Sequence, residues 1–276
     1  RGIKNTIWSL KHIILNSNKK AYFASDFHLG APNKTESRKR ESQIIGWLDH
    51  IKKDAQVVFL VGDIFDFWYE YRKVIPKGFI RIQGKIAERV DQGIQVYFFL
   101  GNHDMWMKKY FTEEIGVQMI ENELKIKIND QTFFIAHGDG LGPGDLGYKF
   151  IKKVFRNRVC QFLFAFVHPS FGLSVANYFS KRSRSYTGKS DEVYLNKENE
   201  WLYLFCQDYL KQEHMDYFIF GHRHLPMEIG LKEGSKYLNL GEWINFNTFG
   251  TYDGQKAMLS SWKDGTVCLF KGVREE

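Results

Sequence analysis

The sequence predicts an α/β fold with a second β-sheet, and three observations support this class. Five short apolar runs, rich in aromatic and β-branched residues, each end directly at a polar segment. Helical patterns separate the first three runs, and the C-terminal part contains further short runs divided by glycine-containing turns. Continuous apolar runs of this length are typical of strands that are covered on both faces.

The N-terminal part has the order β-α-β-α-β. The runs at residues 22–24, 57–61 and 96–100 are the expected strands. Between the first two, apolar residues from 44 to 51 fall on one helical face, and from 82 to 90 they repeat at four-residue spacing between the second and third. In such sheets, ligands collect beyond the carboxyl ends of the strands, so we expect the polar segments to converge on one crevice.

The later part of the chain is expected to continue with strands. Residues 132–136 and 217–220 complete the set of five runs that end at a polar segment. Residues 237–240, 256–259 and 266–270 are further strand-like runs, separated by Asp-Gly turns. We expect these three C-terminal runs to form a second sheet.

Length and composition predict one cytoplasmic domain. A chain of 276 residues with 43% hydrophobic content can bury a large core, so we expect a single domain over residues 1–276. Its three cysteines (Cys160, Cys206 and Cys268) are widely spaced, which favours a reducing compartment over a disulfide framework. The sequence has no signal-peptide pattern, and no apolar run approaches the roughly 20 residues that span a bilayer.

The positive charge is concentrated in one segment. The net charge is +7, yet between Asp145 and Ser190 nine lysine and arginine residues stand against one acidic residue, so this segment holds the whole excess. It lies in the longest gap between polar segments, from His137 to His222. An anionic partner is expected there.

The same segment is predicted to form a helical cap, at about residues 145–212. Apolar residues from 151 to 166 recur at three- and four-residue spacing with basic residues between them, which predicts one amphipathic basic helix. A second apolar stretch follows at 171–179. These aromatics either pack the cap onto the core or form an apolar surface for a lipid phosphate.

Five polar segments, one after each of the first five runs, carry residues that bind divalent metal ions. They are Asp26-Phe27-His28, Gly62-Asp63-Ile64-Phe65-Asp66, Gly101-Asn102-His103-Asp104, His137-Gly138-Asp139 and Gly221-His222-Arg223-His224. Asp, Asn and His supply the oxygen and imidazole nitrogen ligands that suit manganese, iron or zinc. Asp26 and His28 are two residues apart, so they would project to the same side of an extended chain. Each segment alone could be a turn, but the ordered set predicts a two-metal hydrolase of phosphate esters or anhydrides.

The segments resemble the D-x-H, G-D-x-x-D, G-N-H-D/E, G/A-H-G-D and G-H-x-H motifs of the calcineurin-like metallophosphoesterase superfamily. The resemblance covers residues 20–225. It implies a sandwich of two mixed β-sheets flanked by helices, with the helical cap inserted before the last metal motif. It also implies that the protein binds two divalent metal ions, with Mn2+ as the expected metal and Fe2+ or Zn2+ as alternatives.

The resemblance further implies a role for each motif residue. One ion would be held by Asp26, His28, Asp63 and His224, and the other by Asp63, Asn102, His137 and His222. His103 would face the substrate phosphate and transfer a proton toward the departing oxygen. Asp104 would orient the His103 imidazole.

Within this superfamily the chain is most similar to the UDP-2,3-diacylglucosamine hydrolases of lipid A biosynthesis. The shared features are Gly-Asp-x-Phe-x-x-Trp at residues 62–68, a similar insert, and Asp-x-Gly-Tyr at residues 145–148. This resemblance implies cleavage of the pyrophosphate to UMP and 2,3-diacylglucosamine 1-phosphate. The residues implied in substrate binding are Asn102, His103, Asp145, Tyr148, Arg182, Ser185 and Lys189. The chain departs from the family at His103, where many members carry Arg.

The predicted partners are therefore a lipid-linked nucleotide substrate and an anionic membrane surface at the cytoplasmic face of the inner membrane. Nucleic acid is not expected, and the sequence does not predict an oligomeric state. A metal-dependent phosphodiesterase or nuclease of broader substrate range is the alternative, since it could use the same ions and the same basic segment. A non-catalytic binding protein is disfavoured because every ligand and the catalytic histidine are present.

Overall fold

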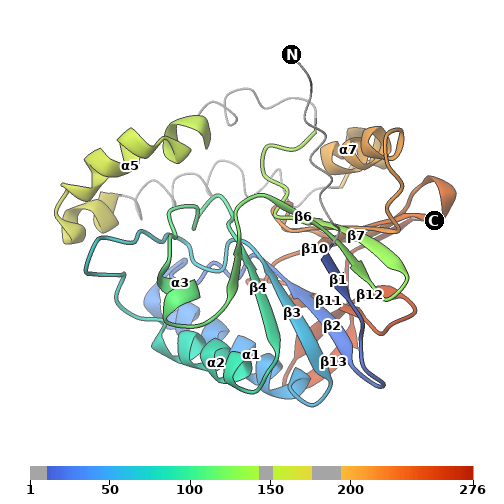
Figure 1. Ribbon diagram of the computed structural model, residues 1–276, viewed down its shortest axis with the longest axis horizontal. Coiled ribbons are helices and arrows are strands. Elements are labelled where there is room, and N and C mark those ends of the chain that lie inside the picture. Colours follow the sequence, from blue (N-terminus) through green and yellow to red (C-terminus); the bar gives the residue numbers. More distant parts are fainter. Residues whose placement is uncertain (1–10, 143–151, 176–193, 276) are drawn as a thin grey trace.

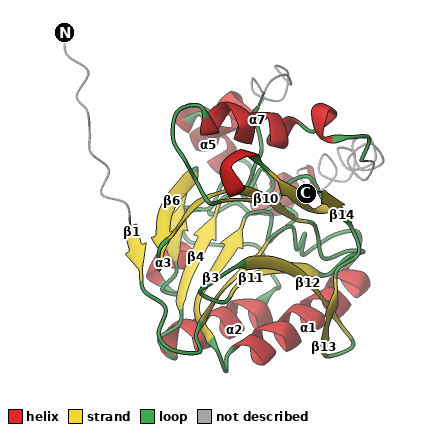
Figure 2. Cartoon of the chain, turned by 90° about the vertical axis from the view of Figure 1, so that its right-hand side faces the viewer, coloured by secondary structure: helices red, strands yellow, loops and turns green. Residues whose placement is uncertain are grey.

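The fold is a sandwich of two β-sheets with helices on both outer sides (Figures 1 and 2). The structure is a computed structural model that describes residues 11–142, 152–175 and 194–275. Within these ranges the strands form two seven-stranded sheets, each containing parallel and antiparallel pairs. The predicted α/β fold with two mixed sheets flanked by helices is confirmed.

The first sheet has the order β13-β12-β11-β2-β3-β4-β5. Its parallel half contains β2 (Lys20–Ala24), β3 (Ala55–Val61), β4 (Gln95–Phe99) and β5 (Gln118–Ile120). Helices α1 (Lys34–Ile51) and α2 (Ile80–Asp91) make the crossovers, which confirms the predicted β-α-β-α-β order. The short helix α3 (Tyr110–Glu113) lies between β4 and β5. The helices α1 and α2 cover the outer face of this sheet (Figure 1).

The second sheet has the order β1-β6-β7-β8-β10-β9-β14. Its strands are β1 (Lys11–Ile13), β6 (Glu123–Ile128), β7 (Gln131–Ala136), β8 (Tyr217–Phe220), β9 (Pro226–Gly230), β10 (Lys236–Leu240) and β14 (Val273–Glu275). Helix α7 (Trp201–Leu210) packs on its outer face through Leu202 and Cys206. Short 3-10 turns lie at Lys197–Asn199 and Lys232–Gly234.

The C-terminal strands do not form one sheet together, so that expectation was wrong. β10 joins the second sheet, whereas β11 (Thr248–Tyr252), β12 (Ala257–Lys263) and β13 (Thr266–Leu269) extend the first. The reason is local, because the two tight turns fold these three strands into consecutive antiparallel pairs, and β11 then pairs with β2. The sequence pattern did not indicate β11, which contains Gly250.

An aromatic layer fills the space between the two sheets. Phe59 of the first sheet stacks on Phe23 and Tyr97, with ring centroids 4.9 and 5.0 Å away. Phe23 also faces Phe133 of the second sheet at 5.9 Å. Burial of such rings, with aliphatic neighbours from both sheets, provides most of the attraction between the layers.

The insert does not contain the single long helix that was predicted over 151–166. Residues 152–156 are helical, the chain is extended at Asn157, and α5 (Arg158–Ala165) follows. The Asn157 side chain accepts hydrogen bonds from the N–H groups of Val159 and Cys160, at 2.8 and 3.3 Å. Asparagine is among the best N-cap residues, so it starts a new helix at this point.

Asp216, just before β8, ties β8 to β7. Its Oδ2 accepts hydrogen bonds from the N–H and the hydroxyl of Thr132, at 2.6 and 2.7 Å. Burial alone would raise the pKa of the Asp216 carboxyl, but these bonds and the His214 imidazole outweigh it and lower the pKa. A carboxyl whose pKa is lower in the folded state stabilises the fold at neutral pH and loses this contribution in acid.

We therefore expect Asp216→Asn to lower the free energy of unfolding by about 1.5–3 kcal/mol at pH 7, the usual value of a hydrogen bond to a charged group. The difference from the wild type should shrink as the pH falls below about 4, where the unfolded carboxyl protonates. Urea unfolding at pH 7 and pH 3 measures both values. The control is Asp208→Asn, at an exposed carboxylate of α7. An equal loss at both pH values would contradict this account.

Candidate metal centre

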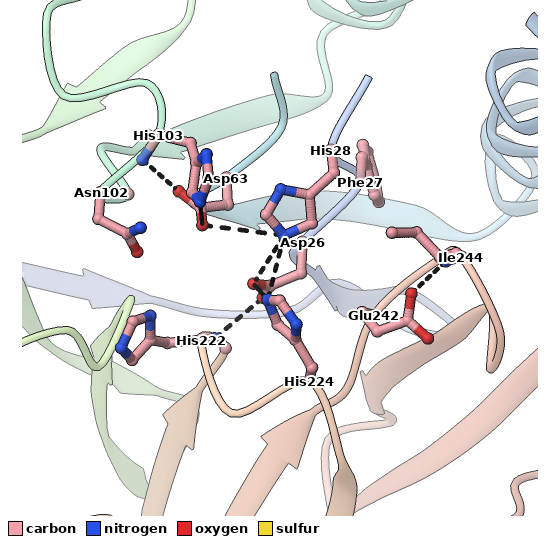
Figure 3. Close-up of polar contacts among 12 residues, drawn as sticks. Asp26, Phe27, His28, Asp63, Asn102, His103, His222, His224, Glu242 and Ile244 are labelled. Atoms are coloured by element: carbon pink, nitrogen blue, oxygen red, sulfur yellow. Dashed lines mark hydrogen bonds and ion pairs between the residues drawn. The ribbon is translucent and has the colours of Figure 1, made fainter. Parts of the chain in front are cut away.

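The five motif segments meet at one edge of the sandwich, between the two sheets, and Figure 3 shows residues of four of them gathered there. Asp26 and Asp63 follow β2 and β3, and Asn102 follows β4. His137 and His222 follow β7 and β8 of the other sheet. The structure thus brings together residues that are up to about 200 positions apart in the sequence, as expected for the carboxyl ends of neighbouring parallel strands.

One group of donor atoms is formed by Asp26, His28, Asp63 and His224. One ligand atom from each lies within 4.8 Å of the others, and His224 alone is partly exposed. The Nε2 atoms of His28 and His224 are 3.1 Å apart, and Oδ1 of Asp26 lies 3.2 Å from His224 Nε2. Two carboxylates and two imidazoles in this arrangement could hold one divalent ion.

A second group lies beside the first and shares Asp63 with it. His137 Nε2 is 3.4 Å from Asp63 Oδ2 and 3.1 Å from Asn102 Oδ1. The His222 ring lies 5.2 Å from the His137 ring, centroid to centroid. His137 Nδ1 faces the Val61 carbonyl oxygen at 2.9 Å. A carbonyl only accepts hydrogen bonds, so Nδ1 carries a proton and Nε2 faces the site. Burial would lower the pKa of His137, but the Asp63 carboxylate outweighs it and raises the pKa to about 10, so an ion that bound Nε2 would displace a proton.

Each central carboxylate has one oxygen that accepts a main-chain hydrogen bond and one oxygen that faces imidazole nitrogens of the site without a hydrogen bond. Asp26 Oδ2 accepts from His222 N at 3.0 Å, and Asp63 Oδ1 accepts from His103 N at 2.8 Å. The other oxygens, Asp26 Oδ1 and Asp63 Oδ2, are buried and accept no hydrogen bond from the described residues. Buried oxygens without a donor are costly unless a cation meets them, so the donor set fits divalent ions.

Both carboxylates are ionised in this environment. Burial would raise the pKa of Asp26, but the His224 and His28 imidazoles outweigh it and hold the pKa well below its usual value. Burial likewise opposes ionisation of Asp63, and His137 and His103 overcome it and lower its pKa. The two carboxylates therefore supply negative charge where cations would bind.

Five of the candidate ligand residues adopt a backbone conformation that the sequence pattern did not reveal. We expected Asp26 and His28 to lie on an extended chain, but their φ angles are 54° and 43°, in the left-handed region. Asp63, His222 and His224 have φ angles of 53°, 64° and 57°. Such strain costs about 1–3 kcal/mol per residue and is concentrated at functional sites, because the surroundings must hold it there. Tight turns, not alternation along a strand, aim these side chains.

Two motif glycines are required by close approach. A Cβ at Gly101 would lie 2.2 Å from Asp63 Oδ1, and one at Gly221 would lie 2.4 Å from Asp26 Oδ2. Any side chain at either position would displace a carboxylate of the site. The glycines that precede Asn102 and His222 in the motifs are thus part of the geometry of the site.

His103 stands at the rim of the two groups, and Asp66 orients it. His103 Nδ1 lies 2.9 Å from the Asp66 carbonyl oxygen and 3.8 Å from Asp66 Oδ1, while Nε2 lies 4.0 Å from Asp63 Oδ2. Burial, reinforced by the neighbouring imidazoles and opposed by Asp63, lowers the pKa of His103 to about 4. The ring is thus neutral, with the Nδ1 proton directed at Asp66.

The sequence assigned this orienting role to Asp104, and the structure differs. The Asp104 carboxylate accepts hydrogen bonds from the N–H groups of Ile64 (2.8 Å), Phe65 (3.4 Å) and Gly101 (2.8 Å), so it braces two motif loops against each other. The sequence did contain a signal for Asp66, because it is the second aspartate of the Gly-Asp-x-x-Asp motif.

The insert is anchored beside the site by residues that the sequence analysis did not single out. Trp106 Nε1 donates to the Phe155 carbonyl at 2.6 Å, and the Tyr69 hydroxyl donates to the Gln161 carbonyl at 2.7 Å. Phe164 of α5 packs on both rings, with centroids 4.7 Å from Tyr69 and 4.8 Å from Trp106. Tyr69 and Trp106 lie three and two residues after the ends of two motifs, so they tie the insert to the motif loops.

Seven residues were predicted to contact the substrate, and the structure describes two of them. Asp145, Tyr148, Arg182, Ser185 and Lys189 lie outside the described residues. Asn102 and His103 do face the centre (Figure 3).

Asp63→Ala should abolish binding of both ions, because Asp63 Oδ2 is near the donor atoms of both groups. We expect Mn2+ bound after equilibrium dialysis to fall from two ions per chain to near zero, measured by plasma mass spectrometry. Asp208→Ala, at an exposed carboxylate of α7, is the control and should keep two ions. A folded Asp63→Ala chain with two bound ions would refute the shared position of this carboxylate.

Comparison with known proteins agrees with this geometry. Residues 19–226 match the sequence profile of the family described as calcineurin-like phosphoesterase. A UDP-2,3-diacylglucosamine hydrolase from Porphyromonas gingivalis is 35% identical over 257 residues, which cover 89% of this chain and 98% of that protein. One from Actinobacillus succinogenes is 27% identical, covering 81% and 92%.

Among solved structures, a dimetal phosphatase from Danio rerio is 11% identical with a TM-score of 0.43, covering 90% of this chain and 100% of that one. The family profile spans all five motif segments and the strands that carry them, including the Asp and His clusters of a dinuclear metal site. This chain belongs to the calcineurin-like phosphoesterase family.

Proposed function

We propose that the chain hydrolyses the pyrophosphate of UDP-2,3-diacylglucosamine to UMP and 2,3-diacylglucosamine 1-phosphate. The observation that carries the proposal is the 35% identity to a UDP-2,3-diacylglucosamine hydrolase over nearly the whole of that protein. The match extends beyond the motif segments into the insert, where substrate selection is expected. A hydrolase of this type needs the metal-binding groups and a surface for acyl chains.

In this proposal Asp26, His28, Asp63 and His224 hold one ion, and Asp63, Asn102, His137 and His222 hold the other. The interatomic distances within each group support the assignment, and Mn2+ is the proposed metal. When bound, the two ions supply a clamp for the attacking and leaving oxygens of the phosphoryl group. The protein contributes fixed carboxylates and imidazoles, which need little reorganisation during the reaction.

His103 is proposed to exchange a proton with the substrate phosphate through Nε2. Its Nδ1 faces the Asp66 carbonyl, so this nitrogen keeps its proton and the ring orientation is fixed. In the neutral ring Nε2 carries no proton, so it would first accept one at the site and then donate it to the departing oxygen. Asp66 is a positioning residue in this scheme, and Asp104 acts through the motif loops.

The exposed face of α5 is proposed to contact the acyl chains and the membrane surface. Val159, Phe162, Leu163 and Phe166 are 60–74% exposed, whereas Phe164 packs inward on Tyr69 and Trp106. Exposure of four large apolar side chains to water at one short helix is typical of an interaction surface. The basic residues Lys153 and Arg158 are exposed nearby. None of the described helices is long and apolar enough to cross a bilayer.

Such a helix can instead lie in the interface of an anionic membrane. We place the chain at the cytoplasmic face of the inner membrane, with the segment at about 145–212 as its cap. Asp145, Tyr148, Arg182, Ser185 and Lys189 are proposed to contact the substrate from that segment.

The direct test is turnover of UDP-2,3-diacylglucosamine with Mn2+ and detergent, followed by mass spectrometry. We expect UMP and diacylglucosamine 1-phosphate from the wild type, and a reduction of about 10²–10⁴-fold in His103→Ala, the usual contribution of a general acid or base. Bound Mn2+ should stay at two ions per chain in this variant. An inert lipid with active cleavage of simple phosphodiesters would replace the proposal by a phosphodiesterase of broader range.

A second test separates the lipid surface from the chemistry. Phe162→Gln combined with Leu163→Gln should lower turnover of the lipid substrate in anionic vesicles at least several-fold, because it removes apolar area from the exposed face. Hydrolysis of a small soluble phosphodiester should be unchanged. Leu269→Gln, at an 82% exposed leucine on β13, is the matched control. Equal losses on both substrates would contradict the role of this face.

A test of the positive charge of this surface should replace Lys153 and Arg158, and not the neighbouring Lys152 and Arg156. Lys152 is bonded to the Asp139 carboxylate at 2.5 Å, and Arg156 to the Glu121 carbonyl at 3.0 Å, so both hold the insert to the core. Replacing either would disturb structure as well as charge.

A further inference from the structure

Arg40 of α1 is a buried cation behind the metal centre. Its side chain is 4% exposed, yet it donates three hydrogen bonds, each of 2.6 Å, to main-chain carbonyl oxygens. Nε bonds to Phe27, and Nη2 bonds to His28 and Ala31. All three carbonyls belong to the loop that carries Asp26 and His28.

This loop is held from two sides. Its N–H groups at Asp26, His28 and Leu29 donate to the carbonyls of Gly62, Asp63 and Ile64, in the next motif. Its carbonyl oxygens face Arg40. Ser37, one turn before Arg40 on α1, accepts from Gly30 N at 2.8 Å and adds a fourth contact from the same helix.

The backbone conformation explains why the loop needs such support. Asp26 and His28 are both in the left-handed region, which costs non-glycine residues about 1–3 kcal/mol each. With three carbonyls fixed on one side, the peptide planes cannot rotate back to a relaxed conformation. The side chains of Asp26 and His28 therefore remain directed at the ion.

Stability alone is a weak reason to keep a charged guanidinium in this place. Burial lowers the pKa of Arg40, and the opposing charges of Glu242 and Glu36 compensate in part. Removing a cation from water is costly even when it is paired, and a well-packed apolar residue often stabilises a core as well. The planar guanidinium can, however, bond three carbonyls at once, which the single ammonium of lysine cannot do in the same geometry.

We propose that Arg40 is a positioning residue for one of the two ions, the one nearest Asp26 and His28. The other group, Asn102, His137 and His222, makes no described contact with Arg40 or with the carbonyls that it binds. Loss of the Arg40 hydrogen bonds should thus weaken the binding of this one ion and leave the binding of the other unchanged. Residues that orient metal ligands typically change metal affinity by about 10–100-fold.

The test is a Mn2+ titration of the metal-depleted protein, with bound and free ion counted by electron paramagnetic resonance. It uses no substrate, so its outcome is independent of the proposed lipid. In Arg40→Lys we expect one ion to bind with wild-type affinity and the other about 10–100-fold more weakly. Excess Mn2+ should restore the second ion.

The matched control is Arg89→Lys. Arg89 of α2 is also buried, at 1% exposed, and bonds the Leu48 carbonyl, but it has no described contact with the metal-binding loops. This variant should keep both affinities even if it is less stable to urea. Wild-type affinity for both ions in Arg40→Lys, or equal weakening of both ions in the two variants, would overturn the proposal.

Near-ultraviolet circular dichroism shows whether Arg40→Lys is folded. If it is not, Ser37→Ala provides the second measurement, since it removes the contact to Gly30 and keeps the buried charge. The same single ion should then bind more weakly, by a smaller factor. Unchanged affinities in Ser37→Ala would count against a role of α1 in positioning the loop.

Discussion

The geometry of the metal centre depends on how the two sheets are packed against each other. Asp26 and Asp63 come from the first sheet, and His137, His222 and His224 come from the second. A shift of one sheet relative to the other would separate the two halves of each donor group. The stacked rings of Phe23, Phe59 and Phe133 fill the space between the sheets and fix their relative position. Close packing of rigid rings tolerates little sliding, so the core sets distances at the site.

The packing of the core sets the approximate positions of the donor groups, and short-range contacts then fix the orientation of individual side chains. Asp104 braces the loops after β3 and β4, the carbonyl of Val61 orients His137, and the carbonyl of Asp66 orients His103. None of these three groups faces the centre itself; each one orients a residue or a loop that does. Five candidate ligand residues have left-handed backbone conformations, which persist only where neighbours hold the loops; the loop of Asp26 and His28, for example, is bonded to the carbonyls of Gly62, Asp63 and Ile64. Rigidity at the centre is thus a property of many hydrogen bonds.

The sequence predicted the fold class and the residues that meet at the site, because both depend on patterns that repeat. Apolar runs that end at Asp, Asn or His indicated strands and ligands together. The conformation of Asp26 and His28 was not predictable, since side-chain spacing alone does not distinguish an extended segment from a tight turn. The break at Asn157 was missed because the apolar spacing continues through it.

Asp66 and Arg40 show another limit of sequence reasoning. Asp66 was part of a recognised motif, but its role depends on which groups surround the His103 ring in the folded protein. Arg40 belongs to a helical pattern in which charged residues are normally solvated, and nothing in the sequence marks it as buried. Only the folded loop, with three carbonyl oxygens directed at α1, shows what this side chain binds.

The insert leaves and re-enters the sandwich at almost the same place. A Cβ on Gly142 would lie 2.6 Å from the Trp201 carbonyl oxygen, so the chain just before the insert touches the start of α7, the part of the predicted cap that packs on the second sheet. A segment whose two ends are neighbours can be lengthened, shortened or exchanged while the surrounding strands keep their register. In the proposed function the insert selects the substrate, so the hydrolytic centre and the substrate-selecting segment would be separable parts of the chain. In evolution, or in protein engineering, one scaffold could acquire a new substrate by replacing a single cassette.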